Sequence, residues 1–213
     1  MRELMQTYGA SLLIAIGIHT VYVLVSVAIG FALGLLLGIL LSRKPKWSFI
    51  VLPIVSIFQT IPGLVFIGVL FIWIGMKPVT VIIALAVYAM FPVMKNTYTG
   101  ILEIDPKYID TANGCGMTSM QRLIHVELPL AMPTIIAGLR MATVYTVSWA
   151  VLAAMIGLGG LGDFIYLGTY TNNNTLILLG AIPAAILAVV LTSIIDHLQK
   201  KVTPRGLQKG GRS

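Results

Sequence analysis

Charged residues are scarce in this 213-residue chain: only 10% of its residues carry a charge, whereas 58% are hydrophobic. An ordinary soluble domain has about 25% charged residues and alternates apolar with polar faces along its helices and strands. Several segments here are apolar on every side, and a soluble fold has no core large enough to hide them. The composition therefore predicts an integral membrane protein.

Reactive side chains are also few. Cys115 is the single cysteine, which excludes an intrachain disulfide and a cysteine metal cluster. His19, His125 and His197 lie in three separate segments and have no metal-ligand spacing. A membrane-embedded enzyme would need histidines, carboxylates or an activated serine gathered at one depth, and no such cluster is evident in the sequence. We predict no catalytic residue, no metal site and no cofactor on this chain.

Phosphate-binding motifs are missing or out of context. No Walker A sequence occurs, so any ATP dependence would need a partner. Residues 157–162 satisfy G-x-G-x-x-G, but they follow an apolar run rather than a strand, and no acidic residue lies about 20 positions further on. The net charge of +7 would suit nucleic acid in a soluble chain, whereas in a membrane protein it reports topology. We expect no nucleic-acid partner.

Five apolar runs predict an all-α protein with about five membrane-spanning helices, since a span needs roughly 20 apolar residues. We expect an extracytoplasmic N-terminus over residues 1–11, a membrane domain over 12–199 and a basic cytoplasmic tail over 200–213. The runs cover residues 12–41, 49–74, 79 to about 93, 130–156 and 176–195.

The cations predict the orientation. They gather in the turn after the first run, in the polar segment 97–129 and in the tail, and these three segments share one side of the membrane if the spans number five. Because cytoplasmic loops are rich in lysine and arginine, the N-terminus is expected outside and the C-terminus inside. The cations concerned are Arg43, Lys44, Lys46, Lys107, Arg122, Lys200, Lys201, Arg205, Lys209 and Arg212.

Three features within the spans carry further predictions. Small residues recur every fourth position from Ser26 to Gly38, which predicts a close contact with another helix. Pro62 and Gly63 interrupt the second run and predict a kink, either bordering a translocation path or merely structural. Arg140 is the one charge in the fourth run and is expected to face protein or water and to anchor hydrogen bonds between helices.

The polar segment 97–129 contains the most informative motif. It closely resembles the signature loop of ABC importer permeases, conventionally E-A-A, three residues, G, nine residues, then I-x-L-P. Ala112, Gly116, Leu128 and Pro129 match this pattern, and conservative replacements stand at Asp110, Thr111 and Val126.

In that family the loop forms short helices that insert into a groove on the ATPase subunit. The residues of the motif have a physical interpretation in this sequence. Asp110 near a helix start would complement the helix dipole, and Ala112 and Gly116 would share one face. Gly116 would allow a close backbone contact or a turn, and Pro129 would begin a new helix.

The resemblance extends over nearly the whole chain and points to the osmoprotectant branch, which imports glycine betaine, carnitine or choline. Residues 59–63, 95–100 and 157–165 look like that branch. Methionine-importer permeases are similar in size and span count, so methionine or another small solute stays an alternative. The resemblance implies a type I, binding-protein-dependent permease of the bacterial cytoplasmic membrane. Its partners would be an ATPase dimer that holds ATP and Mg²⁺, a second permease chain, identical or different, and an extracytoplasmic binding protein.

For the translocation pathway the candidates are Gln59, Pro62, Tyr145 and Trp149. Aromatic faces attract quaternary ammonium groups by cation–π interaction, although the same rings also serve as packing between helices. A secondary transporter or channel is the alternative from another class. It would need its own coupling charges inside the membrane, where Arg140 is the one deeply placed charge of the predicted spans.

Overall fold

The computed structural model describes residues 2–202, and within that range the chain forms helices and turns and no strand, which confirms the all-α prediction. The elements are α1 (Arg2–Ser42), α2 (Pro45–Phe58), α3 (Gly63–Ile74), α4 (Pro78–Leu102), α5 (Pro106–Gly114), α6 (Ser119–Arg122), a π-helical turn (Leu123–Glu127), α7 (Leu128–Ala150), a 3₁₀ turn (Val151–Ile156), α8 (Gly162–Tyr170) and α9 (Asn174–Val202). Arg205, Lys209 and Arg212 of the predicted tail lie outside the described residues.

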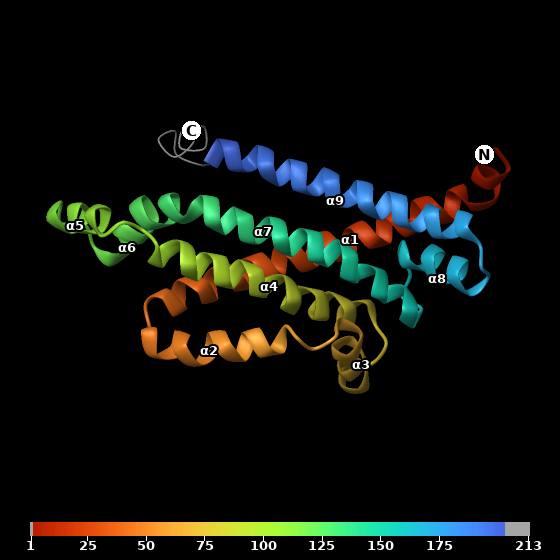
Figure 1. The fold of residues 1–213 in the computed structure, drawn as a ribbon, viewed down its shortest axis with the longest axis horizontal. Coiled ribbons are helices and arrows are strands. Elements are labelled where there is room, and N and C mark those ends of the chain that lie inside the picture. Colours follow the sequence, from red (N-terminus) through yellow and green to blue (C-terminus); the bar gives the residue numbers. More distant parts are fainter. Residues whose placement is uncertain (1, 203–213) are drawn as a thin grey trace.

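Four helical segments among the described residues are long and apolar enough to cross a membrane, and α2 and α3, bent by 97° at the break between them, give a fifth when the pair is counted as one span. The four are Thr7–Ser42, Pro78–Leu102, Ser119–Ala154 and Asn174–Lys201. The first residues of α1 lie with α8 at one end of the bundle, and α5, α6 and the last turn of α9 lie at the other (Figure 1). This arrangement agrees with five crossings, which place the first residues of α1 and the last turn of α9 on opposite sides.

The stripe of small residues on α1 packs closely against α4, as predicted. At Gly34 a Cβ atom would lie 2.6 Å from the carbonyl oxygen of Met90, and at Gly38 it would lie 2.5 Å from Cβ of Thr97. Ser26 belongs to the same stripe and donates a hydrogen bond to a carbonyl oxygen of α4. The two helix backbones can therefore approach because α1 has almost no side chains on this face.

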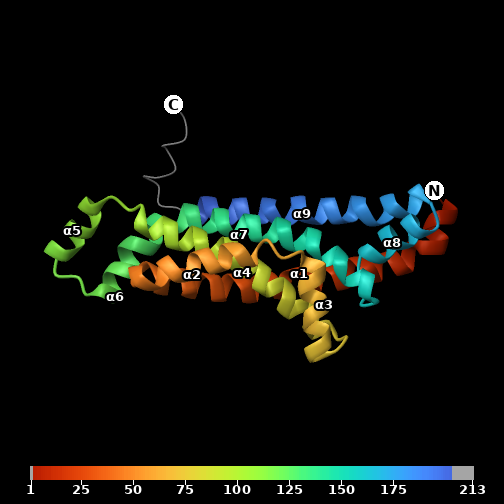
Figure 2. The same cartoon turned by 60° about the horizontal axis from the view of Figure 1, so that its bottom comes forward.

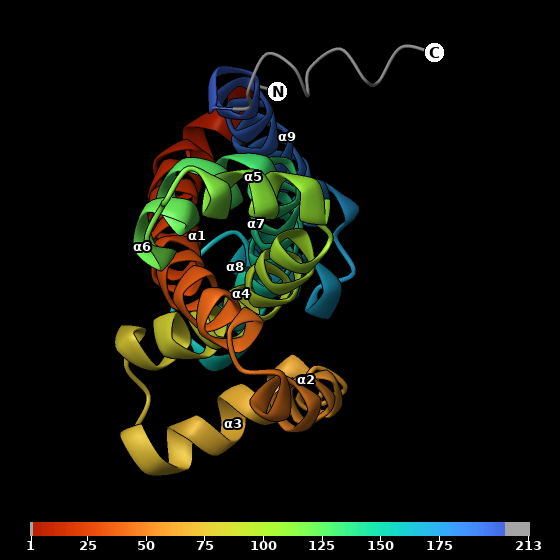
Figure 3. The ribbon, with the colours of Figure 1, turned by 90° about the vertical axis from the view of Figure 1, so that its left-hand side faces the viewer.

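The second span is broken rather than kinked. Pro62 has no backbone N–H and disfavours a helical conformation at Ile61, so α2 ends at Phe58 and α3 starts at Gly63. The predicted position of the interruption is correct, and the bend of 97° is sharper than a kink. As a result α3 projects away from the bundle (Figures 2 and 3).

The third span ends later than predicted. The helix α4 continues to Leu102 and contains Pro92. The sequence predicted an apolar run to about residue 93 that continues into Lys95 and Asn96, with a polar loop from Thr97. Asn96 continues the helix because its side chain finds a partner within it, whereas the buried Thr97 hydroxyl has no hydrogen-bond partner among the described residues. Asn96 Nδ2 donates to the carbonyl oxygen of Pro92 at 2.8 Å, and Thr97 is fully buried against α1.

Arg140 on α7 contacts protein, as expected. Its Nη2 atom lies 3.3 Å from Oδ2 of Asp196 on α9. The ion pair links α7 to α9 and joins two residues that lie 56 positions apart in the sequence.

Candidate functional site

The loop that carries the motif lies at the end of the bundle opposite the first residues of α1. Its first helix, α5, begins at the N-cap residue Asp105, which is not part of the motif. The Asp105 carboxylate accepts a hydrogen bond from the backbone N–H of Lys107 at 3.0 Å and lies 2.7 Å from Lys107 Nζ. Its side-chain and backbone hydrogen bonds with Lys107 hold the pKa of the Asp105 carboxyl below its usual value. Asp110 lies in the middle of α5 and is exposed. The prediction that Asp110 complements the start of a helix was therefore wrong, because the helix starts one turn earlier.

Gly116 ends this helix in a left-handed conformation with φ of +73°. Its N–H donates to Asn113 O at 2.9 Å, and the next N–H, that of Met117, donates to Ala112 O at 3.1 Å. This is the hydrogen-bond pattern of a glycine C-cap. Gly116 is thus required for a turn, and it lies beyond the helix face that buries Ala112, so the predicted shared face was wrong.

The return from the loop is one continuous helix, contrary to the prediction that Pro129 begins a new one. The chain is already helical from Ser119, where Thr118 and Gln121 form a capping box. A π-helical turn precedes α7, and the N–H of Leu128 donates to Leu123 O, five residues back. The wide turn accommodates Pro129, which has no N–H and whose ring would crowd a carbonyl in a regular α-helix.

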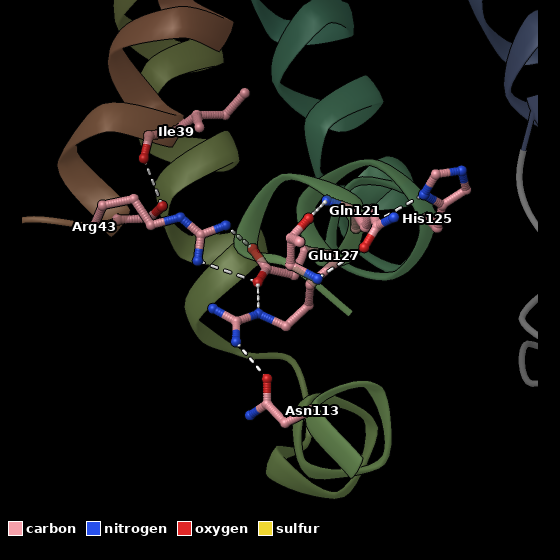
Figure 4. A network of polar contacts seen from close by, with 9 residues as sticks. Ile39, Arg43, Asn113, Gln121, His125 and Glu127 are labelled. Atoms are coloured by element: carbon pink, nitrogen blue, oxygen red, sulfur yellow. Dashed lines mark hydrogen bonds and ion pairs between the residues drawn. The ribbon is translucent and has the colours of Figure 1, made fainter. Parts of the chain in front are cut away.

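A carboxylate that the motif leaves unspecified forms the main polar network of the loop (Figure 4). Glu127 is 2% exposed and pairs with two arginines. Arg43 Nη1 donates to Glu127 Oε1 at 3.1 Å, and its Nη2 contacts Oε2. Arg122 Nε donates to Glu127 Oε1 at 2.9 Å, and Arg122 Nη1 donates to Asn113 Oδ1 at 2.6 Å.

This network was not predicted from the sequence, where both arginines were interpreted only as markers of topology. One signal was available. Glu127 is an acidic residue between the apolar residues Val126 and Leu128, directly before a long apolar run, and a carboxylate buried there needs cationic partners.

The predicted coupling residues occupy two faces of the same loop. The outward set is exposed and consists of Asp110, Thr111 and Gly116. The inward set is buried or half-buried against the bundle and consists of Ala112, Val126, Leu128 and Pro129. The loop therefore has one exposed surface and one packed surface.

A small cavity of about 150 Å³ lies beside the break between α2 and α3. Three of the four predicted pathway residues, Gln59, Tyr145 and Trp149, line it together with Leu85, Tyr88, Pro92 and Thr146. The fourth, Pro62, is not part of the lining. It precedes Gly63, whose Cα hydrogen faces the ring of Trp149.

Tyr88 on α4 also lines this cavity and was not predicted as a pathway residue from the sequence. Its ring centroid lies 3.9 Å from that of Trp149, and its hydroxyl donates to Ile61 O at 2.8 Å in the break. Edge-to-face contacts with Phe66 and Phe91 complete an aromatic cluster. The tyrosine therefore connects α4, α7 and the broken span.

The sequence pattern of one known family, described as "Binding-protein-dependent transport system inner membrane component", matches residues 30–206. The chain belongs to this family. It is accordingly a transport permease and a multi-pass protein of the bacterial cytoplasmic membrane. The resemblance read from the loop motif is confirmed.

Relatives within the family match almost the full length of the chain. It is 38% identical over 208 residues to the "Glycine betaine/carnitine/choline transport system permease protein OpuCB" of Bacillus subtilis, which covers 98% of this chain and 96% of that protein. It is 38% identical over 204 residues to the "Carnitine transport permease protein OpuCB" of Listeria monocytogenes, covering 96% and 94%.

Among solved structures, the permease fold is shared with a chain of the MetNI methionine ABC transporter in an inward-facing conformation. The TM-score is 0.82 at 24% identity, over 91% of this chain and 96% of that one. This likeness confirms the fold of a type I ABC importer permease.

Proposed function

We propose that this permease carries quaternary-amine osmoprotectants, namely glycine betaine, carnitine or choline, in an ATP-driven importer. The observation that carries the proposal is the cavity beside the helix break, which is lined by aromatic rings and contains no charged side chain. The names of its relatives support the same class of solute.

The cavity has the chemistry that a quaternary ammonium group requires. Such a group cannot donate hydrogen bonds and is held by the negative faces of aromatic rings. Tyr88, Tyr145 and Trp149 supply three rings, and the Gln59 amide adds a polar group for a carboxylate or hydroxyl on the solute. A volume of about 150 Å³ is small for a complete solute, since ligand pockets measure roughly 300–1,000 Å³. The solute would therefore be enclosed jointly with a second permease chain.

The proposed assembly contains two permease chains, an ATPase pair and an extracytoplasmic binding protein. ATP and Mg²⁺ would be held by the ATPase pair, and hydrolysis would take place there. The exposed set Asp110, Thr111 and Gly116 would contact the ATPase. ATP binding would close the ATPase pair, move the loop and open the cavity outward, and hydrolysis would reset it inward.

Uptake in proteoliposomes tests this function. The permease is reconstituted with its ATPase and binding protein, and uptake of labelled glycine betaine, carnitine, choline and methionine is measured with and without ATP. Uptake of a quaternary amine that requires ATP supports the proposal. Uptake of methionine alone would overturn the solute class, and uptake without ATP would indicate a secondary transporter.

A further inference from the structure

The helix α1 is not adjacent in the sequence to the loop that is proposed to face the ATPase. The chain enters the loop from α4 and leaves it into α7, whereas α1 ends at Ser42 far away in the sequence. Arg43, directly after α1, nevertheless reaches Glu127 across a sequence separation of 84 residues. This contact joins the cytoplasmic end of α1 to the loop (Figure 4).

The second contact of Glu127, with Arg122, stabilises the π-helical turn. Arg122 and Glu127 lie five residues apart and stand at the two ends of this turn. In a regular α-helix, side chains three or four positions apart face each other. A pair five apart is aligned instead by the wider π turn, so the ion pair favours that turn over a regular helix.

The contacts continue from the π turn into the outward part of the loop. Arg122 also donates to Asn113, which lies on α5 beside Ala112. A continuous line of polar contacts thus runs from Asn113 through Arg122 and Glu127 to Arg43. It begins on the helix that carries Asp110 and Thr111 and ends at α1.

We infer that Glu127 is a positioning residue that transmits movement of the loop to α1 through Arg43. The inference rests on the proposed function, because it assumes that the loop moves with the ATPase. When α5 is displaced, Arg122 and Glu127 follow, and Arg43 pulls the cytoplasmic end of α1 with them.

The charges decide which variants are informative. Glu127 is almost completely buried and is shared by two arginines that are 35% and 20% exposed. Its removal would leave two cations facing each other, and the loop could lose its structure altogether. Replacement of Arg43 leaves Glu127 paired with Arg122, so the loop keeps its internal contacts and loses only the contact with α1.

The test compares Arg43→Gln with Arg43→Lys in the complete transporter. Glycine betaine uptake and ATP hydrolysis are measured in the same proteoliposomes, and their ratio is calculated. Co-purification of the ATPase and the amount of assembled complex are recorded for every variant. Lys107→Gln is the matched control, since Lys107 forms an exposed ion pair in the same loop and its backbone N–H still reaches Asp105.

We expect Arg43→Gln to lower the uptake per ATP by about 5-fold or more, the lower end of typical coupling between sites, while assembly stays intact. Arg43→Lys keeps the charge and should recover part of the ratio, and Lys107→Gln should match the wild type. A wild-type ratio in Arg43→Gln would overturn the inference. Failure of the proposed function itself looks different, because uptake by the wild type would then not depend on ATP.

Discussion

The indole ring of Trp149 on α7 occupies the space beside Gly63, the first residue of α3. A Cβ atom on Gly63 would lie 2.7 Å from the ring atoms Cε3 and Cζ3 of Trp149. The ring also lines the cavity and contacts the Tyr88 ring, with the two ring planes tilted by 60°. Trp149 therefore packs against the break in the second span and at the same time forms part of the cavity wall.

Replacement of Gly63 by alanine should displace Trp149. The added methyl group meets the flat face of the ring, and overpacking of this kind costs about 1–3 kcal/mol. We expect glycine betaine uptake to fall by about 5-fold or more. Gly68→Ala on the same helix is the control, because no atom lies within 4 Å of its added Cβ. Equal uptake by the two variants would show that the contact between Gly63 and Trp149 has no functional role.

Replacement of Trp149 by leucine tests the aromatic recognition of the solute. A cation–π interaction contributes about 0.5–2 kcal/mol, so the affinity for a quaternary amine should fall by about 2- to 30-fold. Trp149→Phe keeps an aromatic face and should retain most of it. The measurement is the concentration dependence of uptake at equal amounts of transporter. Unchanged uptake in Trp149→Leu would remove this residue from the pathway.

Replacement of Gly34 by alanine should destabilise the contact between α1 and α4. The added Cβ would lie 2.6 Å from the carbonyl oxygen of Met90, so the helix backbones must separate. We expect a loss of about 1–3 kcal/mol in the free energy of unfolding, measured on the purified protein in detergent. Gly17→Ala lies on the same helix with open space around it and should cost nothing comparable. Helix propensity favours alanine at both positions, so a similar change in stability in both variants would show that the close contact at Gly34 does not set the effect.

Variants of Gly116 distinguish between two roles of this residue, one in forming the turn and one in contacting the ATPase. Asparagine tolerates a left-handed conformation better than alanine or aspartate does. If Gly116 serves only the turn, Gly116→Asn should keep uptake near the wild type, whereas Gly116→Ala and Gly116→Asp should reduce it. If the ATPase backbone approaches closely, all three should reduce ATPase co-purification as well. Wild-type uptake and co-purification in Gly116→Asp would contradict both roles.

The sequence by itself determined the membrane class, the helical fold, the family and the position of the coupling motif. Span length, cation placement and motif spacing are local properties, and each can be recognised without knowing what lies opposite in space. The stripe on α1 was of the same kind, because a four-residue period places small residues on one helix face whichever helix packs there.

Only the tertiary structure decided which residues act together. The partners of Glu127 come from positions 43 and 122, and no spacing rule relates a turn after the first span to the end of the loop. Tyr88 became part of the cavity wall because the broken span and α7 converge on α4. The end of α4 and the π turn before Pro129 were also decided by contacts in three dimensions, since a buried polar residue or a proline continues a helix wherever its surroundings satisfy the backbone.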